Sequence, residues 1–403
     1  MATTRRAPEL EFDDDDDLDV SDQLAPGDVA AVVNGTDWTT ETIVTQLKRG
    51  NIQLNPRFQR RDAWKRDRKS RFIESLIVGL PIPQIVLAES KTERGKFIVL
   101  DGKQRLLAIS QYWGMGAEPT KNLFALTALP LRPDLRGKTF VDLSTDPTLQ
   151  ADFDSLCNQP IRTIVIRSWK DTNFLHTVFL RLNTGSVSLS PQELRQALLP
   201  GEFSDYVDDA AVASVGLQKL LGTDGPDSRM RDIEILARFL AFKFFAGKYP
   251  GRMKRFLDDS FDEFNRKWSA NKSKVASAVD AFEAGVEELV QVFGDDVARK
   301  PTSRQFNRAI FDALIYFYSD PALLKELRTK RSRVKAAYAG LFATGSPFLG
   351  AIESDTAGAP NTSMRFTQWA AALTKVVGHA VVPPSIPHPP AKKLVQTRAR
   401  KAG

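Results

Sequence analysis

The sequence has few of the side chains from which many enzymes build metal and nucleophile sites. Its 403 residues include one cysteine, Cys157, and three histidines, His176, His379 and His388. A single cysteine excludes an internal disulfide and any metal site built from several cysteines, and it favours a reducing compartment. We expect Cys157 to be a small, partly buried residue of the interior.

Long apolar runs are also missing. No stretch approaches the roughly 18 consecutive apolar residues that a membrane-spanning helix needs. The first residues lack the order of basic and then apolar residues that is typical of a signal peptide. We therefore predict a cytoplasmic protein with no membrane partner.

The charge of the chain is unevenly distributed. The net charge is +7 although Asp13 to Asp17 form an uninterrupted acidic run, so the remainder is more basic than the total suggests. This balance is typical of a protein with a polyanionic partner, and we expect DNA. Lysines and arginines that only solvate the surface would give the same composition.

The pattern along the chain divides it into two polar ends and two structured parts. Residues 1–25 are acidic and residues 381–403 are basic and rich in proline, so both ends are predicted to be disordered. Residues 26–170 mix strand and helix patterns, whereas residues 171–380 are almost entirely helical in pattern. This order predicts an α+β protein with a mixed N-terminal domain and a mostly α-helical second domain.

The mixed domain has several recognisable elements. An amphipathic helix is predicted over 68–80, two paired strands over 84–88 and 96–100, a helix over 103–113 and a further strand over 161–166. Ser190 and Glu193 have the spacing of a capping box at the start of a helix over 191–199. Longer helices are predicted over 231–246, 272–293, 303–318 and 364–377.

The junction Phe97 to Arg105 carries the most chemical information. A buried strand there runs through Asp101-Gly102 directly into a helix. The first N–H groups of a helix have no internal partner and lie at the positive end of its dipole, so they stabilise a phosphate. Gly102 allows close approach of the backbone, and Lys103 and Arg105 supply charged donors. Asp101 would hold a Mg²⁺ ion or orient a water molecule.

A structural explanation of the same junction stays open. In it Asp101 is the N-cap of the helix, and the cations face solvent. The chain has no glycine-rich phosphate loop and no dinucleotide-binding fingerprint elsewhere.

Other motifs accompany this junction in a fixed order. They are Asn-Pro-Arg-Phe-Gln-Arg-Arg-Asp-Ala-Trp (55–64), Gly-Leu-Pro-Ile-Pro (79–83), Asp-Gly-Lys-Gln-Arg (101–105), Arg-Leu-Asn-Thr-Gly (181–185) and Pro-Gln-Glu-Leu-Arg (191–195). In content and order they resemble the GmrSD-type restriction-endonuclease N-terminal domain family. With Arg229-Met230-Arg231-Asp232, the resemblance extends over roughly residues 40–320.

The resemblance implies a fold similar to ParB and sulfiredoxin, followed by a helical region. It also implies nucleotide binding and, as in characterised members, NTP hydrolysis at the Asp-Gly-x-Gln-Arg motif, for which we expect NTP and Mg²⁺ as cofactors. Lys103 stands where many relatives have glutamine. The residues carried over are Asp101, Gln104 and Arg105 as catalytic residues, with Asp101 also as a Mg²⁺ ligand, and Gly102, Lys103, Arg60, Asn183 and Arg195 as nucleotide-binding residues. Glu193 matches the family too, but its capping role is a sufficient explanation.

An HNH-type nuclease centre is not expected in this chain. Family members that cut DNA themselves look as though they carry such a C-terminal domain, which depends on histidine. His176 falls in a predicted amphipathic helix, where a structural histidine is expected. His379 and His388 lie next to or inside the proline-rich tail, with no domain after them. The expected partner is therefore a separately encoded HNH nuclease.

Two functions remain open at this point. The first is a nucleotide-binding, NTP-hydrolysing, DNA-directed component of a prokaryotic anti-phage or modification-dependent restriction system, which licenses the separate nuclease. The second is a nonenzymatic, ParB-like DNA-binding regulator that uses nucleotide as a switch. A degenerate structural partner is disfavoured because Asp101, Gly102, Gln104 and Arg105 are all present. The preferred nucleotide, the DNA recognised and the formation of a homo-oligomer stay open.

Overall fold

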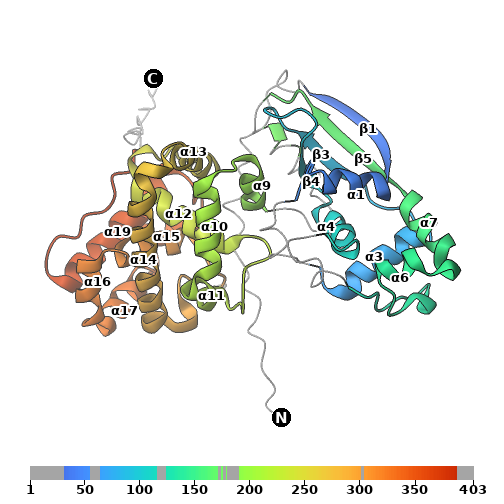
Figure 1. Ribbon diagram of the computed structural model, residues 1–403. Helices are drawn as coiled ribbons and strands as arrows, with labels where there is room; N and C mark the ends of the chain where they lie inside the picture. The colour runs from blue at the N-terminus through green and yellow to red at the C-terminus, as the bar shows by residue number, and fades with distance from the viewer. Residues whose placement is uncertain are drawn as a thin grey trace, which may run out of the picture. The chain divides into compact units, whose positions relative to one another are not determined.

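The computed structural model describes residues 31–54, 64–115, 124–170, 174–175, 178, 190–300 and 304–387. Its elements confirm the predicted α+β class, with one sheet near the N-terminus followed by helices (Figure 1). The predicted disordered N-terminus and most of the predicted disordered tail lie outside the described residues. No helix within the described ranges is long and apolar enough to cross a membrane.

The chain forms two compact units. Among the described residues, the mixed unit comprises those up to Leu236 together with Phe261–Ala270, and the helical unit comprises Ala237–Ser260 and those from Asn271 to residue 387. The first helices that follow the sheet in sequence, up to Leu236, therefore group with the sheet. The domain limits expected from the pattern, including the one between residues 170 and 171, stay predictions.

The mixed unit is built on a five-stranded sheet with the order β1-β5-β3-β4-β2. The strands are β1 (Val32–Thr39), β2 (Ile52–Gln53), β3 (Ile85–Glu89), β4 (Phe97–Asp101) and β5 (Pro160–Arg167). β3 pairs antiparallel with β4 and parallel with β5, while β1 pairs antiparallel with β5. The predicted strand pair and the predicted strand over 161–166 are confirmed, and β4 is an inner strand of the sheet.

The mixed unit also contains eight α-helices that end before Leu236 among the described residues. They are α1 (Thr40–Lys48), α3 (Arg66–Ile77), α4 (Lys103–Tyr112), α6 (Phe140–Thr145), α7 (Gln150–Asn158), α9 (Pro191–Leu198), α10 (Glu202–Ala213) and α11 (Val215–Leu221). α3 ends at Ile77, three residues earlier than predicted, because Gly79 has a positive φ of 74° and Pro81 cannot continue a helix. α9 begins with the predicted capping box of Ser190 and Glu193.

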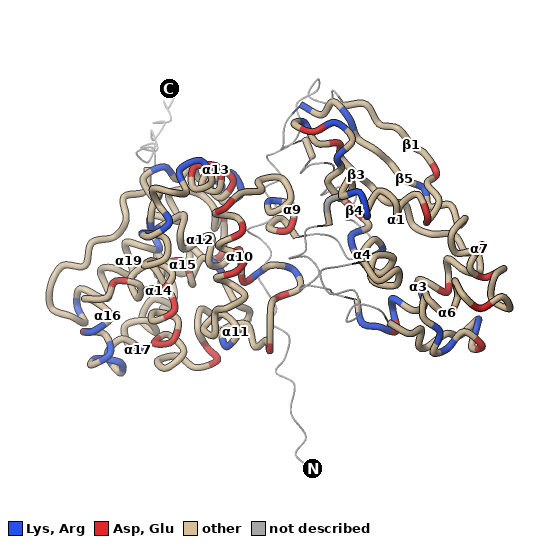
Figure 2. Tube along the Cα trace, in the orientation of Figure 1, with Lys and Arg blue, Asp and Glu red and all other residues tan. Residues whose placement is uncertain are grey.

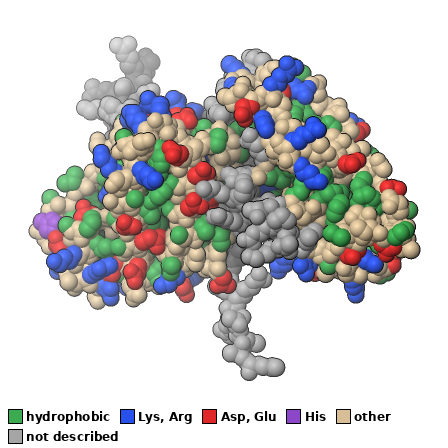
Figure 3. All heavy atoms as spheres, in the orientation of Figure 1, with side chains coloured by type: hydrophobic (Ala, Val, Ile, Leu, Met, Phe, Trp, Pro, Cys, Tyr) green, Lys and Arg blue, Asp and Glu red, His purple; other side chains and the backbone are tan. Residues whose placement is uncertain are grey.

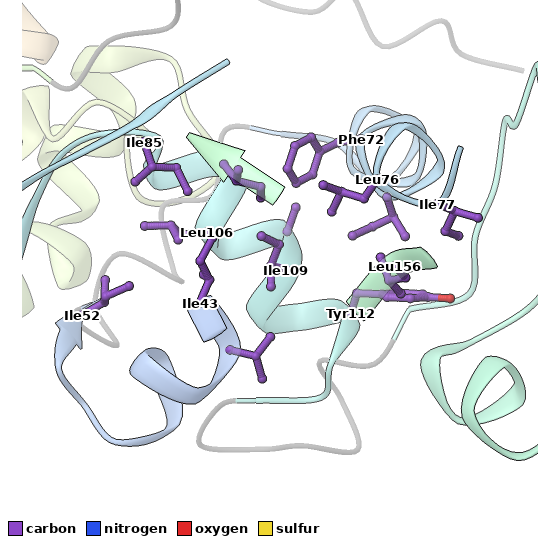
Figure 4. Packing of buried hydrophobic residues seen from close by; sticks show 14 of the residues in the cluster. Ile43, Ile52, Phe72, Leu76, Ile77, Ile85, Leu106, Ile109, Tyr112 and Leu156 are labelled. Carbon is purple, nitrogen blue, oxygen red and sulfur yellow. The ribbon is translucent and has the colours of Figure 1, made fainter. Parts of the chain in front are cut away.

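The two faces of the sheet bury different residues, as the alternation of side chains along a strand requires. Ile85 and Leu87 of β3 belong to a core cluster with residues of α1, α3, α4 and α7 (Figure 4). Val86 and Ala88 belong to a second cluster that includes Leu194 of α9. α4 and α9 therefore pack against the sheet through different core clusters, and the β4–α4 junction belongs to the same unit as both.

The remaining helices run from Arg231 to Val377. They are α12 (Arg231–Phe245), α13 (Met253–Arg266), α14 (Trp268–Phe293), α15 (Arg308–Tyr318), α16 (Pro321–Arg328), α17 (Arg331–Gly340), α18 (Pro347–Glu353) and α19 (Ala359–Val377). Inside the helical unit, Arg238 of α12 forms a buried ion pair with Asp312 of α15, with 2.6 Å between Nη2 and Oδ2. The four predicted long helices correspond to α12, α14, α15 and α19.

Candidate functional site

The turn between β4 and α4 depends on Gly102. Its φ is 96°, a conformation that side chains other than glycine rarely adopt. A Cβ atom at this position would also lie 3.0 Å from Ile85 Cγ1 and 3.3 Å from Arg105 Nη2. Both the backbone conformation and the packing against Ile85 therefore require glycine here, while the predicted role of Gly102 in the approach of a phosphate stays a prediction.

The N-cap of α4 is Gly102, and no side chain caps the helix. The structural explanation in which Asp101 is the N-cap is therefore wrong. The backbone N–H groups of Gln104 and Arg105 have no hydrogen-bond acceptor in the described part of the chain. Since they lie in the first turn of α4, at the positive end of its dipole, they are donors of the kind that stabilise an anion.

The carboxylate of Asp101 is fixed by both of its oxygens. Oδ1 accepts from the Gly102 backbone N–H at 2.7 Å, and Oδ2 accepts from Arg105 Nη2 at 2.9 Å. The side chain of Asp101 is 18% exposed, so it remains open to a small ligand. Asp101 thus closes the turn and orients Arg105 at the same time.

Arg105 is buried, with 8% of its surface exposed. Its Nη2 also donates to the carbonyl of Gln84 at 2.9 Å, at the residue that precedes β3. Nε is buried and has no hydrogen-bond partner among the residues described. An unsatisfied buried donor is costly, so a further acceptor at this guanidinium would stabilise it.

Lys103 is buried too, with 4% of its surface exposed, and its Nζ forms an ion pair with Glu193 Oε1. The other oxygen of Glu193 accepts from the Ser190 backbone N–H at 2.6 Å and completes the capping box. The structural explanation predicted that the cations of this junction face solvent. This is wrong for both Lys103 and Arg105. Glu193 combines the capping role that the sequence predicted with a second role, as partner of Lys103.

Gln104 links the turn to the start of α3. Its Oε1 accepts from the backbone N–H of Trp64 at 3.2 Å, which leaves its amide nitrogen without a partner in the ranges that the structure covers. Trp64 is the last residue of the arginine-and-tryptophan motif. The hydrogen bond therefore brings two of the sequence motifs together.

The three remaining predicted site residues, Arg195, Arg60 and Asn183, are not part of the β4–α4 turn. Arg195 is buried in α9, where Nη1 donates to Gln192 Oε1 at 2.5 Å and the guanidinium lies 5.8 Å from the Phe261 ring centroid. Arg60 and Asn183 lie outside the described residues. The structure thus brings together Asp101, Gly102, Lys103, Gln104 and Arg105, with Glu193 beside them.

Sequence reasoning missed two partners of this site. It identified neither the Gln84 carbonyl as an acceptor for Arg105 nor Glu193 as the partner of Lys103. Both contacts join residues far apart in sequence, and no periodic pattern marks such contacts. Only a prediction that Lys103 is buried would have indicated the Glu193 contact, because a buried lysine requires a partner.

The donor set at the turn limits how a metal ion would bind. Within the described ranges, no group of three or more histidine, cysteine, aspartate or glutamate side chains could hold a metal ion. Asp101 would therefore be a single protein ligand. Mg²⁺ fits such a site, since it commonly takes one or two carboxylates together with substrate phosphates and water.

His379, the only histidine within the described residues, lies outside this site. Its Nε2 lies 3.0 Å from Glu326 Oε1, in an exposed pair of the helical unit. His176 and His388 lie outside the described residues.

Comparison with known families agrees with the motifs. Residues 41–200 match the family model described as GmrSD restriction endonuclease, N-terminal domain. The matched region contains the β4–α4 turn and all of α9, so both partners of the Lys103–Glu193 pair belong to it. No curated protein is significantly similar to the chain. The match confirms the recognised family, over a shorter region than the motifs suggested.

Proposed function

Because residues 41–200 are a domain of the GmrSD restriction-endonuclease N-terminal family, we propose that the chain is the nucleotide-handling component of a restriction system. In this proposal it binds and hydrolyses an NTP, acts on DNA and licenses a separately encoded nuclease. The observation that carries it is the uncapped start of α4, which has free N–H groups beside the fixed guanidinium of Arg105.

The turn supplies what a phosphate needs. The N–H groups of Gln104 and Arg105 would donate to phosphate oxygens at the positive end of the α4 dipole. Arg105 is held by Asp101 and Gln84 before any ligand binds. A guanidinium oriented in advance loses little conformational entropy when it binds an anion, which favours binding.

Hydrolysis requires that a water molecule be placed at the phosphorus atom and that negative charge be neutralised. In the proposed site the free amide nitrogen of Gln104 donates to a phosphate oxygen or to the attacking water. Asp101 would hold the Mg²⁺ that accompanies the nucleotide, and this ion would supply charge neutralisation at the phosphates. Arg105 stabilises the charge that develops on the phosphoryl oxygens.

A second function is favoured by the bonding of Asp101. Both of its oxygens already accept hydrogen bonds within the protein, so the carboxylate closes the turn and orients Arg105 and is not aimed at a water molecule. A site of this kind suits a switch, in which nucleotide binds and changes the conformation without turnover. This alternative predicts saturable NTP binding with no release of phosphate.

The test is phosphate release from ATP, GTP, CTP and UTP with Mg²⁺, with and without DNA. The wild type is compared with Asp101→Ala and Arg105→Ala, and the matched controls are Asp37→Ala and Arg162→Ala. Asp37 and Arg162 form an exposed ion pair of 3.1 Å on the same sheet. Thermal unfolding of each variant separates loss of chemistry from loss of fold.

The outcomes distinguish the two functions. Turnover that is lost in both site variants and kept in both controls supports the NTPase. Binding without turnover in the wild type favours the switch. If the folded wild type neither binds nor hydrolyses any NTP, with or without DNA, both functions are excluded.

A further inference from the structure

The start of α3 carries an unusual concentration of positive charge. Within the segment 65–71 the only acidic residue is Asp67, and Figure 2 shows this end of the helix largely in blue. The cations are Lys65, Arg66, Arg68, Lys69 and Arg71, of which all but Lys69 are exposed. We call Lys65, Arg66, Arg68 and Arg71 the α3 cationic surface.

None of these four cations has a carboxylate partner within 4.0 Å in the described part of the molecule. Asp67, the nearest carboxylate in sequence, accepts instead from Thr127 Oγ1 at 2.9 Å. On the helical unit, by contrast, blue and red side chains are interspersed (Figure 3). There Arg331 lies 2.6 Å from Glu288. The α3 cationic surface is therefore uncompensated within the described structure.

This arrangement costs stability. Lys65, Arg68 and Arg71 follow one another at a spacing of three residues, so like charges lie beside each other on one side of the helix. Lys65, Arg66 and Arg68 also lie at the positive end of the helix dipole, where carboxylates are favoured. Lys65 is the N-cap residue and provides no side-chain hydrogen bond. Since none of these charges is neutralised by a carboxylate in the described structure, an anionic partner is the simplest explanation of them.

We propose that the α3 cationic surface binds the phosphate backbone of DNA. At 1.5 Å per residue, residues 65 and 71 lie about 9 Å apart along the helix axis. One strand of B-DNA carries a phosphate about every 3.4 Å of its axis, so the four cations reach several phosphates at once. Contacts of this kind carry affinity and no sequence information.

A membrane surface fits these residues less well. Interfacial helices insert apolar side chains beside their cations. The apolar side of α3, with Phe72, Ile73 and Leu76, is already buried in the core. The choice of DNA over another polyanion rests on the proposed function, in which the chain is part of a restriction system.

The surface is linked to the candidate nucleotide site. The Arg68 guanidinium lies 4.7 Å from the Trp64 ring centroid, and the backbone N–H of Trp64 donates to Gln104 of the turn. Lys69 Nζ donates to Gln111 Oε1 of α4 at 2.7 Å. DNA held by the α3 cationic surface would therefore lie beside the helix whose first turn is proposed to bind the nucleotide.

The experiment measures binding of a short fluorescent DNA duplex of random sequence over a series of salt concentrations. One variant carries Lys65→Gln, Arg66→Gln, Arg68→Gln and Arg71→Gln. The matched control loses the same charge at exposed lysines of the helical unit, through Lys272→Gln, Lys274→Gln, Lys325→Gln and Lys335→Gln. We expect the α3 variant to lose affinity about tenfold or more, with a shallower salt dependence, and the control to lose far less.

Three results would overturn the inference. They are equal losses in the two variants, no binding of DNA by the wild type, and binding to anionic lipid vesicles in place of DNA. NTP binding is measured on the same variants without DNA. If the α3 variant keeps both DNA affinity and NTP binding, the inference fails while the proposed function stands. If the wild type binds no NTP, the proposed function fails separately.

Discussion

Lys103 Nζ at the start of α4 donates to Glu193 Oε1 of α9, across 90 positions of the sequence. Both side chains are almost completely buried. The pair joins the Asp-Gly-Lys-Gln-Arg motif to the Pro-Gln-Glu-Leu-Arg motif, and Glu193 also caps α9 through Ser190. The start of the helix proposed to bind phosphate is therefore fixed by a residue from a second motif.

Breaking this pair from one side is expected to destabilise the protein strongly. Glu193→Ala leaves the Lys103 charge buried and removes the cap of α9, so we expect a loss of about 3–5 kcal/mol. The double variant Lys103→Gln with Glu193→Gln replaces two charges by two amides. Its loss of stability should be smaller than the sum of the losses of Lys103→Gln alone and Glu193→Gln alone. Urea unfolding of both single variants and the double variant measures the coupling. Additive losses would show that the two side chains do not interact.

Gly102→Ala should be destabilising because it forces both an unfavourable φ and a close contact with Ile85. We expect a loss of about 1–3 kcal/mol in urea unfolding. Gly95→Ala is the matched control, since Gly95 has a φ of 80° but a Cβ there would meet nothing within 4 Å. The difference between the two variants reports the crowding at Ile85. Equal losses would mean that the turn is not crowded.

Asp227 should make stability depend on pH at the acidic end. Burial alone would raise the pKa of Asp227, but the Arg231 guanidinium and the N–H groups of Arg229 and Arg231 outweigh it and hold the pKa below its usual value. A lowered pKa in the folded state adds stability above the unfolded pKa of about 4. That contribution is lost as the pH falls toward the folded pKa.

Asp227→Asn is therefore expected to cost about 1–3 kcal/mol near neutral pH and progressively less below about pH 4. Chemical unfolding at several pH values measures the difference. Asp37→Asn, in the exposed pair with Arg162, should change stability by less than about 1 kcal/mol. A loss at Asp227 that does not vary with pH would refute the assignment.

Cys157 should react slowly with thiol reagents while the protein is folded. Burial raises the pKa of the Cys157 thiol to about 11. At about pH 8 this leaves roughly two hundredfold less thiolate than an ordinary thiol has. Because the chain has one cysteine, the rate with a chromogenic disulfide reagent reports this residue alone. Equal rates in buffer and in denaturing urea would contradict a buried, structural Cys157.

The sequence predicted the elements whose apolar pattern is local. β3, β4, β5, α4 and α9 follow from alternation, a glycine turn and a capping box, so their positions were predicted to within a few residues. β1 was missed because six of its eight residues are exposed and its sequence shows no buried face. Its pairing with β5 depends on residues more than a hundred positions away, which no local pattern indicates.

The part of the candidate site that is local in sequence was predicted, and the part that depends on tertiary contacts was not. Asp101, Gly102 and Arg105 are close in sequence, so a strand-to-helix turn already placed them together. The burial of Lys103 and Arg105 depends on packing against α9 and on the carbonyl before β3, and these are tertiary contacts. The position of the turn was therefore predicted correctly from the sequence. The capping explanation was wrong about its cations, because it placed in solvent two side chains that are buried.

The most direct test of the central claim is equilibrium binding of NTPs to the full chain by titration calorimetry with Mg²⁺. The wild type should bind at least one NTP saturably, and Arg105→Ala should weaken that binding about tenfold to a hundredfold. Arg105→Lys keeps the charge and serves as a second variant if the alanine variant does not fold. Undiminished binding in folded Arg105 variants, or no binding in the wild type, would contradict a nucleotide site at the β4–α4 turn.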